Sequence, residues 1–253
     1  MAILLPAFFL TALLYAMVGF GGGSTYSALL ILAGTDYQLL PAVSLSCNIV
    51  VVAGGVWHFG RRGALPWSRF WPFMVLSVPM AWVGGSLRIS ESLFVGLLGL
   101  VLLISGIAML LQTGPRRASV VTMPGAAGQI FAWLAGALIG LLSGIVGIGG
   151  GIFLAPLLHL TAWGPAKSIA AASSLFILLN SIAGLGGQLW KLESFARLGE
   201  LTPYAWLIPA VLLGGQIGSR TGANRLPGQR IRILTGVLVL AVGLRLLYRV
   251  ITS

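Results

Sequence analysis

Residues 19–23 read Gly-Phe-Gly-Gly-Gly, and residues 147–151 read Gly-Ile-Gly-Gly-Gly. Each glycine run interrupts a long apolar stretch that carries no charged residue. A glycine inside a helix costs about 1 kcal/mol relative to alanine, so a cluster of glycines predicts a break in the helix. Within a membrane such a break frees backbone amides, which can face an anion. We therefore interpret the chain as two copies of a half-unit, each built around one break.

The composition decides the class of protein. Apolar residues make up 58% of the 253 residues and charged residues only 8%, with a mean hydropathy of +1.02. A soluble domain carries about a quarter of charged residues, and several stretches here exceed the ~20 apolar residues that cross a bilayer. Short alternating segments, which a transmembrane β-barrel requires, are absent. The composition predicts an all-α polytopic membrane protein with the lipid bilayer as its partner.

The net charge of +11 does not indicate a nucleic-acid partner. The basic residues occupy the short gaps between apolar runs, where they signal membrane topology and contact lipid headgroups, whereas a nucleic-acid module gathers them on one soluble face. The single cysteine, Cys47, leaves no intrachain disulfide, and the two histidines lie 101 residues apart. We therefore expect no metal and no cofactor.

Two uncharged runs are too long for one membrane helix. Residues 1–35 would reach roughly 50 Å as a single helix, against a ~30 Å hydrocarbon core, and residues 118–166 are longer still. Each run must break, and the glycines predict where. The pieces could form a bent span with an interfacial helix, or a re-entrant hairpin that enters and leaves on one side. Either way we expect about eight helical membrane elements.

An internal repeat is visible by offset. The glycine runs lie 128 residues apart, and Ser46 matches Ser174 at the same offset. A Pro-x-x-x-x-Gly-Gly segment at 79–85 matches residues 209–215, and two glycines near the end of each half match at an offset of 137. We expect a first membrane repeat at 1–112, a linker at 113–126 and a second repeat at 127–253. Such repeats place a transporter's site at the midplane between the halves.

The relative orientation of the halves depends on the glycine segments. If these segments span the membrane, the halves are parallel and the basic residues divide nine to six across it. If they are re-entrant, the halves are inverted and the division is ten to five, the five being Arg88, Lys191, Arg197, Arg245 and Arg249. The positive-inside rule mildly favours the inverted repeat.

The paired G-x-G-G-G runs, together with the Pro-x-x-x-x-Gly-Gly segment in the third helix of each half, resemble the sulfite exporter TauE/SafE family over the whole chain. The resemblance implies a bacterial inner-membrane, multi-pass permease for small sulfur-containing anions such as sulfite, thiosulfate and sulfoacetate. It does not choose among these anions. One departure is Ala28, where the second half has Pro156.

The candidate binding residues are of two kinds. Half-helices that start near the glycine runs present unpaired amides and a positive dipole end, which together form an anion site. The second helix of each half also has polar residues at its centre, which could donate hydrogen bonds to the substrate or join helices to each other. Asn48 and Asn180 differ by one helical turn in the repeat, so the site is not strictly symmetric. The candidates are Gly21, Gly22, Gly23, Gly149, Gly150, Gly151, Ser44, Ser46, Asn48, Ser173, Ser174 and Asn180.

No carboxylate falls in a predicted helix centre, so the chain lacks the usual intramembrane relay of a proton pump. The membrane potential could drive export instead, because one negative charge moving outward gains ~2.3 kcal/mol per 100 mV. Two alternatives stay open: a non-transporting subunit of a larger complex, and a membrane-embedded enzyme, which the missing catalytic pairs disfavour. Cys47 could exchange with a sulfur substrate or be a buried apolar residue. A homo-oligomer is compatible with the sequence.

Overall fold

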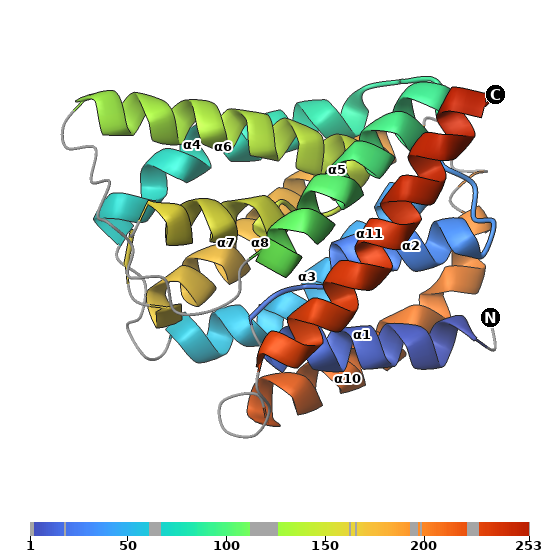
Figure 1. Cartoon of the computed structure of the whole chain (residues 1–253), viewed down its shortest axis with the longest axis horizontal. Coiled ribbons are helices and arrows are strands. Elements are labelled where there is room, and N and C mark those ends of the chain that lie inside the picture. Colours follow the sequence, from blue (N-terminus) through green and yellow to red (C-terminus); the bar gives the residue numbers. More distant parts are fainter. Residues whose placement is uncertain are drawn as a thin grey trace.

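The structure is a computed structural model that describes residues 3–17, 19–60, 67–111, 126–161, 163–164, 166–192, 197, 199–221 and 228–252. These residues form ten α-helices and one 3-10 helix (Figure 1). In chain order they are α1 Leu4–Met17, α2 Gly23–Leu32, α3 Leu40–Gly60, α4 Trp67–Ser86, α5 Glu91–Leu111, α6 Ala126–Val146, α7 Gly151–Leu160, α8 Ala166–Lys191, η1 Gly199–Trp206, α10 Leu207–Thr221 and α11 Gly228–Thr252.

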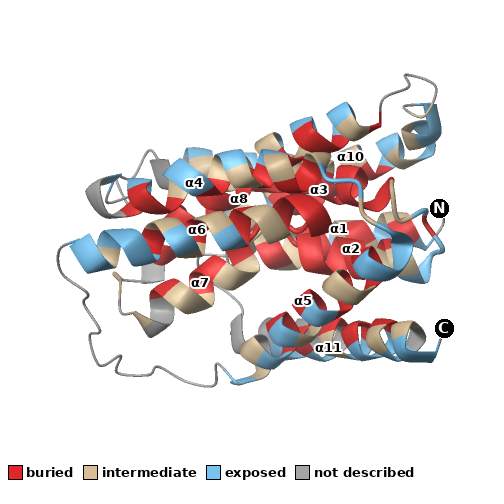
Figure 2. Cartoon of the chain, turned by 90° about the horizontal axis from the view of Figure 1, so that it is seen from above, coloured by how far each residue is buried: buried red, intermediate tan, exposed pale blue. Residues whose placement is uncertain are grey.

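The predicted all-α membrane fold is confirmed. By length and composition, four of the described helices can cross a bilayer, through Leu40–Trp57, Glu91–Ala108, Ala126–Val146 and Ser168–Lys191. The structure has more helices than the eight expected elements because each glycine run divides one element in two: α1 from α2, and α6 from α7. The faces turned away from the helix bundle are exposed along most of these helices (Figure 2), as lipid contact requires.

A short 3-10 helix precedes α10 in the second half. The 3-10 helix η1 contains Pro203, and α10 begins only at Leu207. Pro209 consequently lies in the first turn of α10, where its missing amide hydrogen bond is not needed. The expected linker at 113–126 lies outside the described residues up to 125, and α6 begins at its last residue.

Helices α3 and α8 pack against each other at the centre of the bundle. Helices α4 and α6 cover this pair on one side, and α1 and α10 cover it on the other. The short helices α2 and α7 pack against α3 and α8, respectively. The α5–α11 pair packs against α2 and α7 as a separate outer layer (Figures 1 and 2). At the repeat offset, α1, α3 and α4 of the first half correspond to α6, α8 and α10 of the second half. The pairings follow the same correspondence: α4 packs against α6 as α10 packs against α1, and α4 packs against α8 as α10 packs against α3.

Contacts of glycines give the directions of the helices. In the α5–α11 pair, Gly106 lies against Gly236 and Gly243 lies against Gly99, so the two helices are antiparallel. In the α3–α8 pair, Gly55 faces Ser174 while Gly184 faces Leu45, which again requires antiparallel helices. Counterparts of an inverted repeat run antiparallel, so these contacts support the inverted arrangement, which stays a prediction.

The chain reverses its direction at both breaks. A Cβ atom on Gly22 would lie 2.9 Å from Thr11 Cγ2, almost two turns back along α1. A Cβ atom on Gly150 would lie 2.9 Å from Ile139 Cγ2, almost two turns back along α6. Thr11 and Ile139 are themselves 128 residues apart, so both halves fold back in the same way. In Figure 1, α2 returns toward the end where α1 begins, and α7 returns toward the end where α6 begins.

Candidate anion site at the two helix breaks

The breaks exist because their glycines adopt backbone angles that other residues avoid. Gly19 and Gly22 have φ of 81° and 89°, and Gly147, Gly149 and Gly150 have φ of 78°, 82° and 77°. All of these are in the left-handed region, which costs an L-residue with a side chain roughly 1–2 kcal/mol. Gly22 is the N-cap of α2 and makes no side-chain cap. The left-handed glycines end one helix and allow the next to start in a new direction.

Both breaks leave consecutive backbone amides without an acceptor. In the described part of the chain, no hydrogen bond is made by the amides of residues 21–24, and none by those of residues 148–152. The first bonded amides of α2 are those of Thr25 and Tyr26, which donate to the Gly22 carbonyl. In α7 the amides of Phe153 and Leu154 donate to the Gly150 carbonyl in the same way. Almost all of these free amides belong to buried residues, and a buried amide without a partner is rare in proteins.

The two breaks meet inside the protein. A Cβ atom on Gly23 would clash with the carbonyl oxygen of Ile148, so the start of α2 lies directly against the second break. Asn48 of α3 lies between them, with its side chain against Gly21, Gly23 and Gly149. The positive ends of two half-helices therefore converge at one buried place. Each end carries about half a unit of positive charge, an arrangement that an anion between them would stabilise.

Hydrogen bonds cross between the halves at this place. Asn48 Nδ2 donates to the carbonyl of Ile148 at 3.0 Å, so α3 holds the second break. Ser174 Oγ donates to the carbonyl of Gly19 at 2.6 Å, so α8 holds the first break. Within the first half, Ser44 Oγ of α3 donates to the carbonyl of Gly23 at 3.2 Å. These three predicted residues are therefore at the breaks, but their donors are bonded to backbone carbonyls.

Three other predicted residues have different surroundings. Ser46 donates to Ala42 of its own helix at 2.8 Å, and no described contact joins it to a break. Asn180 accepts a 2.6 Å bond from Ser77 of α4 and donates to Phe176 at 2.9 Å, so it joins α8 to α4. Ser173 is fully buried, and its hydroxyl has no described partner.

Ser181 is the side chain that sequence reasoning did not select. Its hydroxyl is fully buried, has no described partner, and lies 2.9 Å from where a Gly149 Cβ would be. The Tyr26 hydroxyl is in a similar position: it has no described partner, and it lies 3.3 Å from where a Cβ atom on Gly22 would be. The signal for Ser181 was its place beside Asn180 on the polar part of α8, but only the packing shows which of the two faces the break. Cys47 is fully buried in the apolar core.

Discontinuous helices whose half-helices begin at a common buried centre are a feature of α-helical membrane transporters. The chain belongs to the family "Sulfite exporter TauE/SafE", whose model matches residues 4–246. It is also similar to a protein named "Probable membrane transporter protein y4hK" from Sinorhizobium fredii (strain NBRC 101917 / NGR234), with 37% identity over 242 residues and 96% of each chain covered. No solved structure matches the chain. The chain is thus a multi-pass membrane transporter of the TauE/SafE type and not an enzyme.

Proposed function

We propose that this chain exports small sulfur-containing anions, such as sulfite, thiosulfate or sulfoacetate, across the bacterial inner membrane. The anion binds where the two helix breaks meet. The description of the matched family names sulfite, and the relative from Sinorhizobium fredii carries the general name of a membrane transporter. The observation that carries the proposal is the pair of buried amide runs, residues 21–24 and 148–152, at the start of α2 and α7.

The chemistry of the centre fits an oxyanion. Amides and hydroxyls are the donors that anion oxygens accept, and Ser181 adds a hydroxyl without a described partner beside Gly149. Hydrogen bonds from neutral donors to an ionised acceptor are about twice as strong as those between neutral groups. Asn48 and Ser174 fix the breaks by binding their carbonyls, so the amides keep their positions when the site is empty.

The export direction follows from charge. Among the described acidic residues, Asp36, Glu91 and Glu200 lie outside the helix centres, so no carboxylate relay crosses the bundle through them. A single negative charge that leaves the cell gains ~2.3 kcal/mol per 100 mV of membrane potential. The two halves, related as an inverted repeat, would open the same central site to each side in turn.

The test is binding of sulfite to detergent-purified protein, measured by thermal shift, for wild type and Ser181→Ala. Loss of one hydrogen bond to a charged ligand removes roughly 1.5–3 kcal/mol, so we expect the apparent Kd to rise at least about tenfold. Ser105→Ala is the matched control, because Ser105 is equally buried and unpartnered but lies on α5, away from the breaks. It should leave the Kd unchanged.

A transport assay of the same purified protein in proteoliposomes distinguishes a transporter from a non-transporting subunit of a larger complex. Uptake or release of sulfite by the purified chain alone argues against a non-transporting subunit of a complex. A panel of sulfite, thiosulfate, sulfoacetate, sulfate, chloride and phosphate identifies the substrate class. If sulfur anions neither raise the melting temperature of the purified protein nor cross the proteoliposome membrane with it, the proposed site is wrong. The site is also wrong if Ser105→Ala weakens binding as much as Ser181→Ala.

A further inference from the structure

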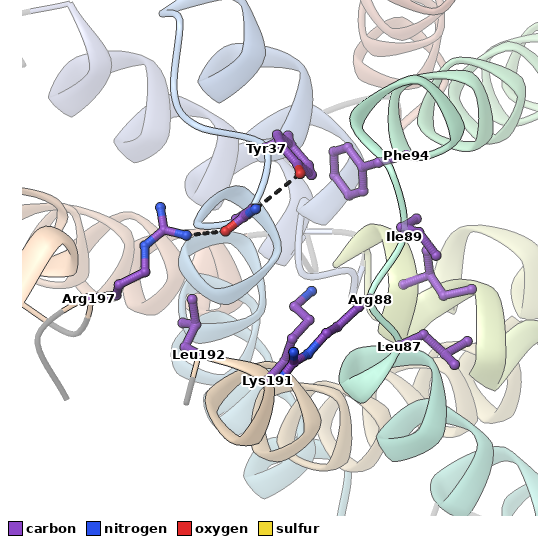
Figure 3. A pocket seen from close by; sticks show the side chains of 10 residues that line it. Tyr37, Leu87, Arg88, Ile89, Phe94, Lys191, Leu192 and Arg197 are labelled. Carbon is purple, nitrogen blue, oxygen red and sulfur yellow. Dashed lines mark hydrogen bonds between the residues drawn. The ribbon is translucent and has the colours of Figure 1, made fainter. Parts of the chain in front are cut away.

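A cavity of about 340 Å³ opens at the end of the protein where both termini lie. Its walls come from five separate segments: the link before α3, the link from α4 into the start of α5, the end of α6, the end of α8, and Arg197 (Figure 3). Bulk water occupies ≈30 Å³ per molecule, so the cavity can hold a small oxyanion with several waters. Ile145, close to the end of α6, forms part of the lining. The cavity therefore reaches from the surface to the residues that precede the second break.

Among the residues that the structure describes, the charged ones that line this cavity are all basic. Arg88, Lys191 and Arg197 are lining residues, and the described lining contains no carboxylate. Figure 3 shows the Lys191 side chain rising between Arg197 and the Leu87–Ile89 segment. Lys191 is half-buried, and none of the described residues forms an ion pair or hydrogen bond with it. A partly desolvated cation without a counter-charge is unfavourable unless an anion accompanies it.

Arg197 is held at the rim by two carboxylates outside the cavity lining and by Gln38 within it. It forms ion pairs with Asp36 at 2.9 Å and Glu200 at 3.3 Å, and it donates to Gln38, which in turn donates to Tyr37 at 3.0 Å. Its hydrogen bond to Glu200, followed by the one to Asp36, raises the pKa of Arg197 above its ordinary value. Both ion pairs are substantially exposed, and such pairs contribute little stability. An anion in the cavity can therefore exchange with a carboxylate for the same guanidinium.

Topology does not explain these cations. In the inverted arrangement, ten basic residues lie on the opposite side of the membrane and only five on this side. The positive-inside rule explains the ten basic residues on the opposite side, but it does not explain the five basic residues on this side. Three of the five line one cavity, whereas Arg245 lies on α11, outside that lining. A functional reason for the three is thus the better explanation.

We propose that this cavity is a second anion-binding site, an outer vestibule in which Lys191 is the principal contact for a small oxyanion. This inference rests on the proposed transport of anions. The vestibule holds the anion between bulk solution and the helix breaks, with Arg88 and Arg197 at its walls. Clefts lined by charge of one sign raise the local concentration of the opposite ion.

The direct test uses the fact that the chain has only two lysines, Lys191 and Lys167. Reductive methylation with ¹³C labels both and keeps their charge, and Lys191→Arg assigns the signals. Sulfite added to the labelled, detergent-purified protein should shift the Lys191 signal saturably and leave the Lys167 signal in place. The shift should persist in Ser181→Ala, because that change weakens only the central site. An unmoved Lys191 signal overturns the vestibule.

A transport measurement gives an independent test. In proteoliposomes, Lys191→Gln should raise the KM for sulfite presented on the vestibule side by at least about threefold, with less effect at high salt. Lys191→Arg should restore the KM, and Arg245→Gln is the charge-matched control on the same side. If wild type transports sulfite and Lys191→Gln keeps the same KM from both sides, the vestibule is wrong while the proposed function stands. If wild type neither binds nor transports sulfite, the proposed function itself fails.

Discussion

At the scale of single residues, two different demands fall on the glycines of the breaks. Gly22 requires a left-handed backbone, with φ of 89°, and it also lies close to Thr11 and Tyr26. Gly34, in the turn after α2, has a similar φ of 75°, but a Cβ atom there would meet nothing within 4 Å. The two positions therefore separate backbone strain from crowding.

We expect Gly34→Ala to reduce the free energy of unfolding by roughly 1–2 kcal/mol, the penalty of the left-handed conformation alone. Gly22→Ala should cost about 1–3 kcal/mol more, because the new methyl group must displace Thr11 or the Tyr26 ring. Unfolding of the purified protein by SDS titration measures both. Equal losses for the two variants would show that the break has room for a side chain.

At the scale of elements, glycines set the distance between helices. Gly136, Gly140 and Gly144 lie one turn apart on α6, and their missing side chains leave space for carbonyls of α4. Gly214 and Gly218 of α10 face carbonyls of α1 in the same manner. Because lipid removes the hydrophobic drive between helices, close backbone packing of this kind is a main source of association in membranes.

Gly144→Ala tests the α4–α6 contact. A Cβ atom there would clash with the carbonyl oxygen of Ala81, so we expect a loss of roughly 1–3 kcal/mol from overpacking. Gly186→Ala on α8 is the matched control, since its Cβ would make an ordinary 3.5 Å contact with Trp82 Cδ1. That control should be neutral or stabilise by up to about 1 kcal/mol, through helix propensity. A control loss as large as that of Gly144→Ala would contradict the packing argument.

At the scale of the whole molecule, the direction of each helix decides which segments share a side of the membrane. Gly214 contacts Phe9 and Gly218 contacts Leu13, so α1 and α10 are parallel. Helices α1 and α3 begin at the same end of the bundle, and α2 returns to that end (Figure 1). This arrangement favours the re-entrant alternative of the two that the sequence leaves open, in which the first hairpin enters and leaves on one side; it stays a prediction.

Cysteine labelling tests this arrangement, because the single native cysteine, Cys47, is fully buried and can be replaced by alanine. We expect Ile3→Cys, Gly34→Cys and Gly199→Cys to react with a membrane-impermeant maleimide from outside intact cells. Leu111→Cys, at the other end of α5, should react only after the membrane is opened. Labelling of Ile3→Cys and Gly34→Cys from opposite sides would show that the first hairpin spans the membrane.

The helix breaks could be predicted from the sequence because their causes are local. Uncharged runs longer than a bilayer must break, and only residues 19–23 and 147–151 combine enough glycine to do so within them. The boundaries of α5 also follow from local signals, with Glu91 in its first turn. The repeat offset of 128 predicts that Gly22 and Gly150 have similar surroundings, and their contacts with Thr11 and Ile139 match at that offset.

The side chains that face the centre were decided by tertiary packing. Asn180 and Ser181 are neighbours on α8, and helix rotation directs Asn180 toward Ser77 of α4 and Ser181 toward Gly149. Asn48 joins a carbonyl one hundred residues away. No local pattern specifies such partners, because they depend on how far each helix is turned against its neighbour.

The sequence by itself determined the class, the all-α fold and the two glycine breaks, since hydropathy and backbone preference act within one segment. Tertiary structure alone brought the breaks together and made the Lys191 cavity, whose lining comes from residues 37–38, 87–89, 94, 145, 191–192 and 197. These segments are remote in sequence, and each charge among them resembles an ordinary loop residue. Only the directions and packing of the helices place them around one space.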